Sequence, residues 1–416
     1  MTWPVRKIDD VAVFLNSRRV PVKAADRAKR QGPYPYYGAS GIVDWVDGYI
    51  FDGEYLLISE DGENLRSRNT PIAFLAHGKY WVNNHAHILD EREPGILRYL
   101  SWALNRTDLS PYITGAAQPK LNKRTLSNVE IPIPPMAERL EINAVLGALD
   151  DKIELNRRMS ATLEEMARAL YRSWFVDFDP VRARAHGQPP AHMDAPTAAL
   201  FPESFGADGL PMGWEMSTIG EVAETVGGAT PKTQEPTFWD GPHRWATPRD
   251  LSKLGQPVLF ETERTLSNSG LATISSGLSP AGTVLLSSRA PIGYVAIAQN
   301  PVAVNQGFIA LRETDQISSV EAYFWVQSNM DAILANANGS TFQEISKKNF
   351  RPLPCVVAPE AVRSAFRDLA GTWFNRVAGL CAENAKLAAL RDTLLPRLMS
   401  GELRIRAAER LAEEVA

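Results

Sequence analysis

Apolar residues recur at every seventh position in two long stretches of this chain. The first track runs through Ile142, Leu149, Asn156, Leu163 and Leu170, and the second runs through Phe366, Trp373, Leu380, Leu387 and Leu394. Positions seven apart share one side of an α-helix, so the tracks predict one helix from Met136 to about Phe175 and another from about Pro359 to Met399. One such stripe is typical of an ordinary amphipathic helix. Two matched stripes favour helices that pack together as an antiparallel coiled coil.

A second apolar track accompanies the first one in the earlier helix. It consists of Val145, Met159 and Met166, which lie three positions after members of the main track. Asn156 is the one polar residue of the main seam, and Leu380 stands at the matching position of the later helix. A polar residue in an apolar seam can fix the register of two helices at some cost in stability.

Short apolar runs precede each predicted helix. Residues 49–51 and 54–58 are bounded by Asp-Gly pairs, which favour tight turns between strands. Residues 283–286 and 293–298 are the clearest strands of the later half, and short helices are expected at 96–105 and 321–334. The pattern predicts an α+β protein with two strand-rich mixed α/β domains, each followed by a long helix.

The two halves of the chain repeat one plan. Lys123 and its neighbours align with Lys347 and its neighbours, and the starts of the halves align where Ile8 corresponds to Ile219. The expected segments are a first domain at 1–134, a central helix at 135–180, a linker at 181–212, a second domain at 213–357, a C-terminal helix at 358–402 and a tail at 403–416. The middles of the two domains differ, so one scaffold is expected to present two different surfaces.

Composition narrows the class of protein. With 416 residues, 44% of them hydrophobic, the chain has material for more than one core. Its net charge of −4 does not indicate a nucleic-acid binder, so any basic surface must be local. Two cysteines, Cys355 and Cys381, suit a reducing compartment. Because no signal-peptide pattern and no apolar stretch of ~18 residues are present, we expect a soluble cytoplasmic protein without a membrane partner.

Motifs for catalysis are missing from the sequence. It has no phosphate-binding loop, dinucleotide fingerprint, nucleophile elbow, zinc-ligand spacing or Asn-Pro-Pro-aromatic tetrapeptide of a base-directed methyltransferase. His85 and His87 resemble a metal pair, but no third ligand lies close in sequence, which favours polar contacts. Asp150 and Asp151 fall within the helical pattern and indicate surface charge. A binding protein that holds no metal or cofactor of its own is the prediction.

Seven short segments of the chain occur in the order of a known family. They are Gly38–Ile42, Gly53–Gly62, Gln118–Asn122, Ile131–Pro135, Thr247–Leu251, Leu285–Gly293 and Val304–Phe308. Together with the repeat, they resemble the specificity subunit of type I restriction–modification enzymes over nearly the whole chain. The second half departs from the pattern at Gly339–Ile345, which lacks the proline present in the first half.

The resemblance implies a division of labour between subunits. Two target-recognition domains would each read one half of a split, asymmetric DNA site, and the two helices would hold the domains apart. Modification subunits, expected in two copies, would bring S-adenosylmethionine and methyl transfer. Restriction subunits would use ATP and Mg²⁺ for translocation and cleavage in defence against phage. The chain itself would be a non-catalytic DNA-binding subunit.

Three sets of side chains are candidate DNA contacts in the first domain. The sets are Arg18, Arg19, Lys23, Arg27, Lys29 and Arg30 with Tyr36; then Asn83, Asn84 and His85; then Gln118, Lys120, Asn122 and Lys123. A basic run followed by aromatic residues suits phosphate contact, although a solvated basic loop is the alternative. Asn suits adenine, so the second set is either a group of base readers or a group of polar residues at a strand end.

Arg249 and Arg289 are the main candidates in the second domain. Each is expected at the end of a strand, where an Arg can pair bidentately with guanine or clamp a phosphate. A salt bridge to Asp250 is the alternative role of Arg249. The further candidates are Ser287, Ser288, Asn305, Gln306, Thr341, Gln343, Lys347 and Lys348.

Another class of function stays open at this point. The same repeat could bind protein partners, with the helix pair serving only to hold a non-enzymatic scaffold together. Duplex binding that falls steeply with salt would favour DNA recognition over such a scaffold. A self-sufficient modification enzyme is the third reading, and it needs a cofactor site that the sequence does not display.

Overall fold

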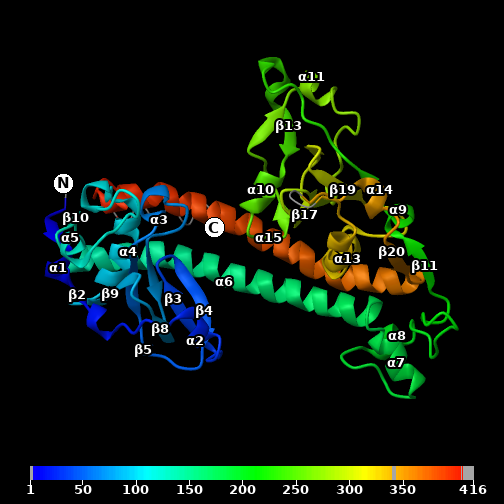
Figure 1. Cartoon of the computed structure of the whole chain (residues 1–416), viewed down its shortest axis with the longest axis horizontal. Coiled ribbons are helices and arrows are strands. Elements are labelled where there is room, and N and C mark those ends of the chain that lie inside the picture. Colours follow the sequence, from blue (N-terminus) through cyan, green and yellow to red (C-terminus); the bar gives the residue numbers. More distant parts are fainter. Residues whose placement is uncertain (1–2, 340–342, 404, 406–416) are drawn as a thin grey trace. The chain divides into compact units, whose positions relative to one another are not determined.

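The computed structural model describes residues 3–339, 343–403 and 405 of the chain. Its contacts divide into two compact units. Unit 1 runs to Leu155 and resumes at Asn384, and unit 2 is Asn156–Glu383. Two helices of 40 residues each, α6 (Met136–Phe175) and α15 (Glu360–Met399), contribute one part to each unit (Figure 1). Their bounds agree closely with the helices predicted from the seven-residue tracks.

Unit 1 contains three sheets with strand orders β1-β10, β2-β9-β6-β7 and β4-β3-β8-β5. The strands are β1 (Val5–Lys7), β2 (Ala12–Phe14), β3 (Tyr34–Gly38), β4 (Gly41–Val46), β5 (Phe51–Asp52), β6 (Tyr55–Ser59), β7 (Ala73–Ala76), β8 (Lys79–Val82), β9 (Ala86–Glu91) and β10 (Glu130–Pro132). The helices are α1 (Ile8–Val11), α2 (Ala24–Arg27), α3 (Asn64–Ser67), α4 (Ile96–Arg106) and α5 (Lys123–Ser127). Neighbouring strands are antiparallel except for β3 and β8, which run parallel.

The main core of unit 1 lies between sheet β2-β9-β6-β7 and the helices. Leu56 of β6 and Leu100 of α4 belong to this core, and both side chains are fully buried. The first part of α6 adds Ile142 to it, and the last part of α15 adds Leu394. In addition, Asp150 of α6 forms an ion pair with Arg391 of α15 at 2.9 Å. Asp150, expected to be plain surface charge, therefore joins two helices within unit 1.

Unit 2 contains three sheets with strand orders β11-β20, β12-β19-β16-β17-β14 and β15-β13-β18. The strands are β11 (Glu215–Thr218), β12 (Glu224–Val226), β13 (Trp239–Ala246), β14 (Val258–Leu259), β15 (Arg264–Leu266), β16 (Val284–Ser288), β17 (Ile292–Ala298), β18 (Val302–Val304), β19 (Phe308–Arg312) and β20 (Pro354–Val357). The helices are α7 (Asp179–Ala185), α8 (Ala195–Ala198), α9 (Ile219–Val222), α10 (Pro248–Ser252), α11 (Asn268–Leu271), α12 (Ser319–Ser328), α13 (Met330–Ala335) and α14 (Lys347–Phe350). The helix expected at 321–334 is thus two helices, α12 and α13.

Aromatic rings join α6 to α15 within unit 2. Phe366 of α15 has no exposed surface, and its ring centroid lies 5.1 Å from that of Phe175 and 5.8 Å from that of Tyr171. Trp174 contributes a third ring at 6.0 Å. The large rings at these positions fill the space between the helix ends and the adjacent α12, so the helices share one core with the sheet domain of unit 2.

The segment expected to be a linker is part of the core of unit 2. Residues 181–212 contain α8 and most of α7, and their apolar side chains Val181 and Phe201 are buried in that core. The rings of Phe201 and Trp174 lie 4.9 Å apart in an edge-to-face arrangement. The high Pro and Ala content conceals the few apolar anchors, because they follow no helix or strand period.

The repeat seen in the sequence is present in the fold. β1 pairs with β10 in unit 1, and β11 pairs with β20 in the same antiparallel way in unit 2. The short helix α1 follows β1, just as α9 follows β11, and their first residues Ile8 and Ile219 are both fully buried. Each strand that ends a domain leads directly into a 40-residue helix. One plan is therefore built twice.

The second apolar track of α6 differs from the predicted one. Met166 is 45% exposed, whereas Leu146, Ile153, Ala167 and Trp174 are buried. The buried positions lie four residues after the main track, not three. Both spacings return to one side of a helix, so sequence alone cannot select between them. Within the described residues, no helix has the length and apolar character needed to cross a membrane.

Candidate nucleic-acid interface

Three loops meet at the end of β6 in unit 1. The Glu60 amide donates to the His85 carbonyl at 2.8 Å, and the Leu121 amide donates to the Glu60 carbonyl at 2.8 Å. Two backbone hydrogen bonds between Thr114 and Lys120 close the third loop, and Lys120 lies opposite Asp61 in a β-bridge. We call residues 60–61, 83–86 and 114–121 the first junction.

Glu60 is the electrostatic centre of the first junction. Its carboxylate accepts from Arg19 at 2.6 Å and lies 3.5 Å from the Lys120 ammonium. Burial works to raise the pKa of Glu60, but the Arg19 hydrogen bond and the surrounding cations outweigh it and hold the pKa below its ordinary value. Glu60 therefore stays ionised and holds two cations on either side of the strand end.

His87 is a structural residue beneath the first junction. It is fully buried, Nε2 donates to the Leu121 carbonyl at 2.7 Å, and Nδ1 accepts from the side-chain Nδ2 of Asn16 at 2.8 Å. Burial lowers the pKa of His87, which matches this neutral tautomer. Both ring nitrogens are occupied, so His87 does not offer itself to a metal. No cluster of three or more His, Cys, Asp or Glu ligands occurs among the residues with described positions.

Polar side chains project from the first junction. His85 is exposed and pairs through Nδ1 with Asp61 at 2.8 Å. Asn84, Gln118 and Lys120 are also exposed. Asn83 is buried, and its side-chain oxygen accepts from the His85 amide at 2.7 Å. Asn83 is therefore a polar residue that shapes the turn, which corrects its prediction as a base reader.

An equivalent junction ends β16 in unit 2. The Ser288 amide donates to the Gly307 carbonyl at 2.8 Å, and the Ile345 amide donates to the Ser288 carbonyl at 3.0 Å. Two backbone hydrogen bonds join Asn338 and Glu344, and Glu344 lies opposite Arg289 in a β-bridge. The second junction, residues 288–289, 305–307, 338–339 and 343–345, repeats the hydrogen bonding of the first.

The order of charges is reversed between the junctions. In the first, the strand end carries the acid Asp61 and the facing loop carries Lys120; in the second, the strand end carries Arg289 and the loop carries Glu344. The Arg289 and Glu344 side chains are 3.7 Å apart and remain 38% and 48% exposed. One backbone arrangement thus presents two different sets of hydrogen-bonding groups.

Other predicted residues of the second junction divide into exposed and buried groups. Gln306 and Gln343 are exposed, and the Asn305 side chain accepts from the Gly307 amide at 2.9 Å. Ser287 is fully buried and bonds to the Pro291 carbonyl and the Tyr294 amide, and Ser288 is buried beside it. Ser287 and Ser288 are therefore corrected from DNA contacts to residues that hold the strand end. Thr341 lies outside the described residues.

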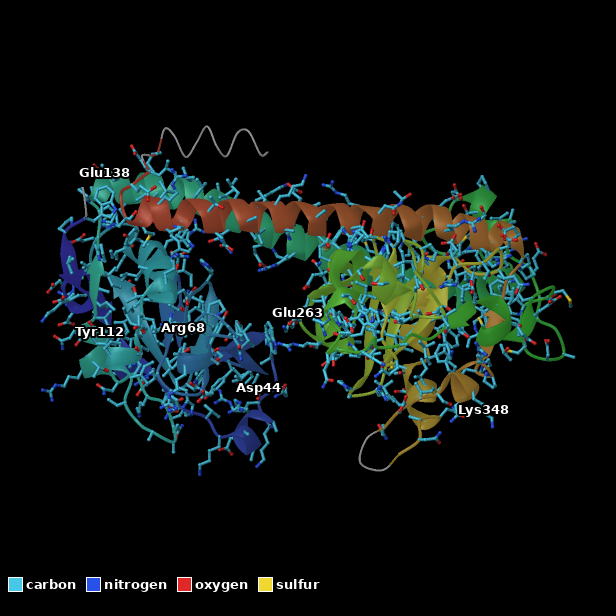
Figure 2. The ribbon with its side chains drawn as sticks, turned by 90° about the horizontal axis from the view of Figure 1, so that it is seen from above. Asp44, Arg68, Tyr112, Glu138, Glu263 and Lys348 are labelled. Carbon is cyan, nitrogen blue, oxygen red and sulfur yellow. The ribbon has the colours of Figure 1, made fainter. Side chains whose placement is uncertain are left out.

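Three of the six cations in the basic run at residues 18–30 pair with acids from elsewhere in unit 1. Arg27 pairs with Asp44 at 2.7 Å, and Arg30 pairs with Asp47 at 2.9 Å (Asp44 is labelled in Figure 2). Arg19 is held by Glu60. Arg19 and Arg27 are mostly shielded and support the fold, whereas the Arg30 side chain stays 40% exposed, and its contact with DNA stays a prediction.

The remaining members of that run have different surroundings. Arg18 lies over the ring of Phe51 and donates to the Ile50 carbonyl at 3.2 Å. Tyr36 is buried beneath Arg27, so it is not an exposed aromatic contact. Lys23 and Lys29 are exposed, and they are the cations of the run that keep the predicted phosphate-binding character.

Basic residues stand at the start of a short helix in each unit. Asn122 caps α5 by accepting from the Thr125 amide at 3.0 Å, and the exposed Lys123 follows it. Lys347 and Lys348 are exposed in the matching helix α14, where Figure 2 shows Lys348 at the surface. The correspondence of Lys123 with Lys347 is preserved in three dimensions, whereas Asn122 has a capping role.

Arg249 lies in α10 and not in a strand-end loop. Its guanidinium is 70% exposed and lies 3.4 Å from Glu263. Asp250, the partner considered from sequence, instead accepts from the Thr247 amide and hydroxyl at 2.7 Å. The exposed side chain of Arg249 stays a candidate for contact with a phosphate or a base.

Sequence reasoning missed three acidic residues of the junctions. Glu60, Asp61 and Glu344 were not predicted, because cations and amides are the side chains that suit contact with phosphates and bases. A signal was present: Glu60 and Asp61 belong to the segment Gly53–Gly62, and Lys120 aligns with Glu344 across the repeat. An opposite charge at an aligned position marks a place where the two domains differ in chemistry.

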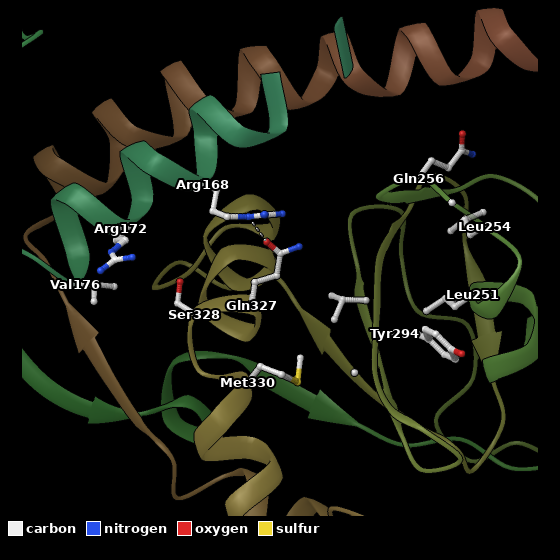
Figure 3. Close-up of a pocket in the computed structure, with 13 residues that line it drawn as sticks. Arg168, Arg172, Val176, Leu251, Leu254, Gln256, Tyr294, Gln327, Ser328 and Met330 are labelled. Atoms are coloured by element: carbon white, nitrogen blue, oxygen red, sulfur yellow. Dashed lines mark hydrogen bonds between the residues drawn. The ribbon is translucent and has the colours of Figure 1, made fainter. Parts of the chain in front are cut away.

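A separate cleft of about 780 Å³ lies within unit 2 (Figure 3). Arg168 and Arg172 of α6 line one side, and Leu251 and Tyr294 line the other. Arg168 is held by Gln327 at 3.1 Å and by Glu164 at 2.8 Å. The cleft has a mixed lining in which the guanidinium of Arg168 is already paired, so it lacks the features of a phosphate site.

Known proteins share this organisation. Residues 1–165 and 211–355 match the family described as "Type I restriction modification DNA specificity domain". The specificity subunit of the type I restriction enzyme HindI from Haemophilus influenzae is 27% identical over 329 residues, which cover 68% of this chain and 71% of that protein. The MjaIX specificity subunit from Methanocaldococcus jannaschii is 37% identical over 138 residues, which cover 33% of this chain and 32% of that protein.

A solved structure has the same fold. It is the S subunit of a type I restriction–modification system from M. genitalium, with a TM-score of 0.59 and 16% sequence identity over 96% of each chain. The family match covers well over half of the chain in two separate copies, in agreement with the duplicated junctions. The chain belongs to the family of type I restriction–modification DNA specificity subunits.

Proposed function

We propose that this chain reads a split, asymmetric DNA site through its two junctions. Membership of the family makes it a DNA sequence-recognition subunit that assembles with other subunits of a restriction–modification system. The main observation behind this proposal is that the two junctions have the same backbone hydrogen bonds but the opposite order of charged side chains. Equal scaffolds would approach the two half-sites alike, and unequal side chains would select different bases.

Phosphate contacts are proposed for exposed lysines in both units. Lys23, Lys29 and Lys123 in unit 1, with Lys347 and Lys348 in unit 2, are among the predicted cations with exposed side chains. Phosphate contacts position a protein on duplex DNA without reading its sequence. The local clusters would provide this attraction although the net charge of the chain is −4.

The chain is proposed to act without catalysing a reaction itself. Modification subunits, in two copies, would bind S-adenosylmethionine and transfer methyl groups, and restriction subunits would use ATP and Mg²⁺. The purified chain should therefore neither methylate nor cut duplex DNA, whereas addition of the modification subunits should restore methylation. Methyl transfer by the pure chain alone would contradict this assignment.

The two long helices are proposed to form an antiparallel pair that sets the spacing of the half-sites. Support comes from inside each unit, where α6 and α15 share a core: Phe175 meets Phe366 in unit 2, and Asp150 meets Arg391 in unit 1. The late part of α6 thus meets the early part of α15, and the early part of α6 meets the late part of α15. That order supports opposite helix directions.

Duplex binding and methylation mapping test the proposal together. The full chain should bind duplex DNA with an affinity that falls steeply between about 50 and 200 mM salt. In a host carrying the complete system, the methylated positions should define two different half-sequences separated by a fixed gap. A salt-indifferent association with protein partners would instead support the scaffold function, and one palindromic motif would contradict asymmetric reading.

A further inference from the structure

The Arg289–Glu344 pair has the chemistry to read a complete base pair. We infer that these two side chains together recognise one G·C base pair in the half-site of the second domain. The inference rests on the proposed function, because it identifies the residues and the base pair of that same site. Glu344 was not among the residues expected to contact DNA.

Geometry places a donor and an acceptor side by side at the second junction. Arg289 follows the last residue of β16, and Glu344 lies opposite it in the β-bridge. The Arg289 nitrogen and the Glu344 oxygen are 3.7 Å apart, which is longer than a good hydrogen bond. Both side chains keep exposed surface. Neither group is therefore consumed by the other, and both can reach an outside partner.

In the major groove, a G·C base pair presents hydrogen-bond acceptors and a donor in the order that matches the Arg289 donors and the Glu344 acceptor. Guanine presents the acceptors N7 and O6, and the adjacent cytosine presents its N4 amino donor. Arg289 can donate two hydrogen bonds to guanine while Glu344 accepts one from cytosine. An A·T pair presents the adenine N7 acceptor, then the N6 amino donor, then the thymine O4 acceptor, so the second guanidinium donor of Arg289 would face another donor.

The carboxylate strengthens the case for base contact over phosphate contact. A glutamate close to the DNA backbone repels phosphates, and an arginine meant only for a phosphate gains nothing from such a neighbour. This repulsion is offset where the carboxylate accepts a hydrogen bond from a base. Glu344 is thus explained by a position at the base edges, with Arg289 beside it to balance its charge.

The first junction shows why this recognition belongs to the second domain alone. There the acid on the strand end, Asp61, is already held by His85 at 2.8 Å, and Glu60 is held by Arg19 at 2.6 Å. Its carboxylates are occupied within the protein, and the Lys120 ammonium lies 3.5 Å from Glu60. The two domains therefore present different patterns through the same backbone arrangement.

The test uses the full chain with its modification subunits, and duplexes that carry the site defined by methylation mapping. Each base pair of the second half-site is exchanged singly, and binding is measured for the wild type, Arg289→Ala and Glu344→Ala. At one G·C position, the preference of the protein for G·C over the other base pairs should fall in both variants. The fall should be about 5- to 150-fold, which corresponds to ~1–3 kcal/mol. The first half-site should be read as before.

Arg244→Ala is the matched control. Arg244 forms a closer Arg–Glu pair with Glu261, at 2.6 Å, on strand β13 of the same unit, and it is not one of the residues of the second junction. This variant should keep the preference at every position. Unfolding by denaturant is measured in parallel, so that a loss of stability is separated from a loss of discrimination.

Several results would overturn the inference. The second half-site could lack a G·C pair, the affected position could be an A·T pair, or both variants could weaken all duplexes equally. A fall in stability with unchanged base preference would show that the pair is only structural. If the wild-type complex binds no duplex at all, the proposed function fails first, and the outcome is distinguished from failure of the base assignment.

Discussion

Arg19 donates a hydrogen bond of 2.6 Å to Glu60 and lies largely inside unit 1, although its sequence context indicates DNA contact. The two side chains are only 16% and 13% exposed. The same guanidinium nitrogen reaches the Ala86 carbonyl at 2.9 Å. Arg19 therefore joins the end of β6 to the start of β9, and it stabilises the junction from beneath.

Arg19→Ala should destabilise unit 1 more than it weakens phosphate attraction. Removing one partner leaves the poorly solvated Glu60 without its main donor, and a cost of about 1–3 kcal/mol is expected after allowing for residual exposure. Denaturant unfolding of the full chain measures this change. The exposed Lys23 provides the comparison, because Lys23→Ala should alter stability by less than about 0.5 kcal/mol. Equal effects of the two variants would contradict the structural role of Arg19.

Glu60 gives this stabilisation a defined dependence on pH. Its folded pKa lies below its ordinary value of 4.5, because the Arg19 hydrogen bond and the neighbouring cations outweigh the opposing effect of burial. The contribution is therefore complete above about pH 4.5 and is lost as the pH falls through the lower folded pKa. Glu60→Gln should flatten the decline of unfolding free energy on acidification. A decline as steep as that of the wild type would place the responsible group elsewhere.

Truncation of Phe366 should strongly destabilise unit 2. It is fully buried among the rings of Tyr171, Trp174 and Phe175, and Phe366→Ala should cost about 3–5 kcal/mol through lost contacts and the cavity that remains. Chemical denaturation monitored by tryptophan fluorescence gives the measurement. Leu369→Ala on the same helix serves as control, because that side chain is 41% exposed and its loss should cost far less.

Much of the scaffold follows from the sequence alone. The ends of α6 and α15 were predicted to within a few residues, because a seven-residue apolar period over forty residues has few other structural solutions. The repeat also predicted which helices and strands correspond, from α1 and α9 to α5 and α14. The choice between a three- and a four-residue step for the second track required the packed structure, since both steps keep a residue on the same helix side.

The candidate site was predictable in location but not in detail. Lys120 and Glu344 occupy aligned positions in the sequence, and the structure places both at strand-end junctions. The sequence did not predict the ion pairs of the basic run, because their partners are distant along the chain: Asp44 lies 17 positions after Arg27. Ser287 also looks like a surface polar residue until the fold shows that its hydroxyl bonds to backbone in the interior.

Lys347 should contribute to affinity without contributing to sequence preference. It is an exposed cation at the start of α14, so Lys347→Ala should weaken binding to specific and unrelated duplexes alike and reduce the salt slope by about one unit. Titrations at several salt concentrations test this. Lys253→Ala is the control, because Glu263 already neutralises that lysine at 3.2 Å. A selective loss of specific binding would reassign Lys347 to base reading.

Paired insertions in the long helices test whether they set the half-site spacing. Four residues added after Leu155 in α6 and four after Glu383 in α15 fall where each helix passes from one unit to the other, so neither core is interrupted. Leu163, which the track alone suggests as an insertion point, packs on the core of unit 2 and would disturb it. Four residues make about one helical turn and lengthen a helix by ~6 Å, close to two base pairs of duplex DNA at ~3.4 Å each.

The methylated site of the variant with both helices lengthened should keep both half-sequences and widen its gap by about two base pairs. Inserting four residues after the exposed Gly187 changes the chain length between the halves but neither helix, so that variant should keep the original gap. An unchanged gap in the helix variant, with methylation still active, would show that the spacing is set by something other than α6 and α15.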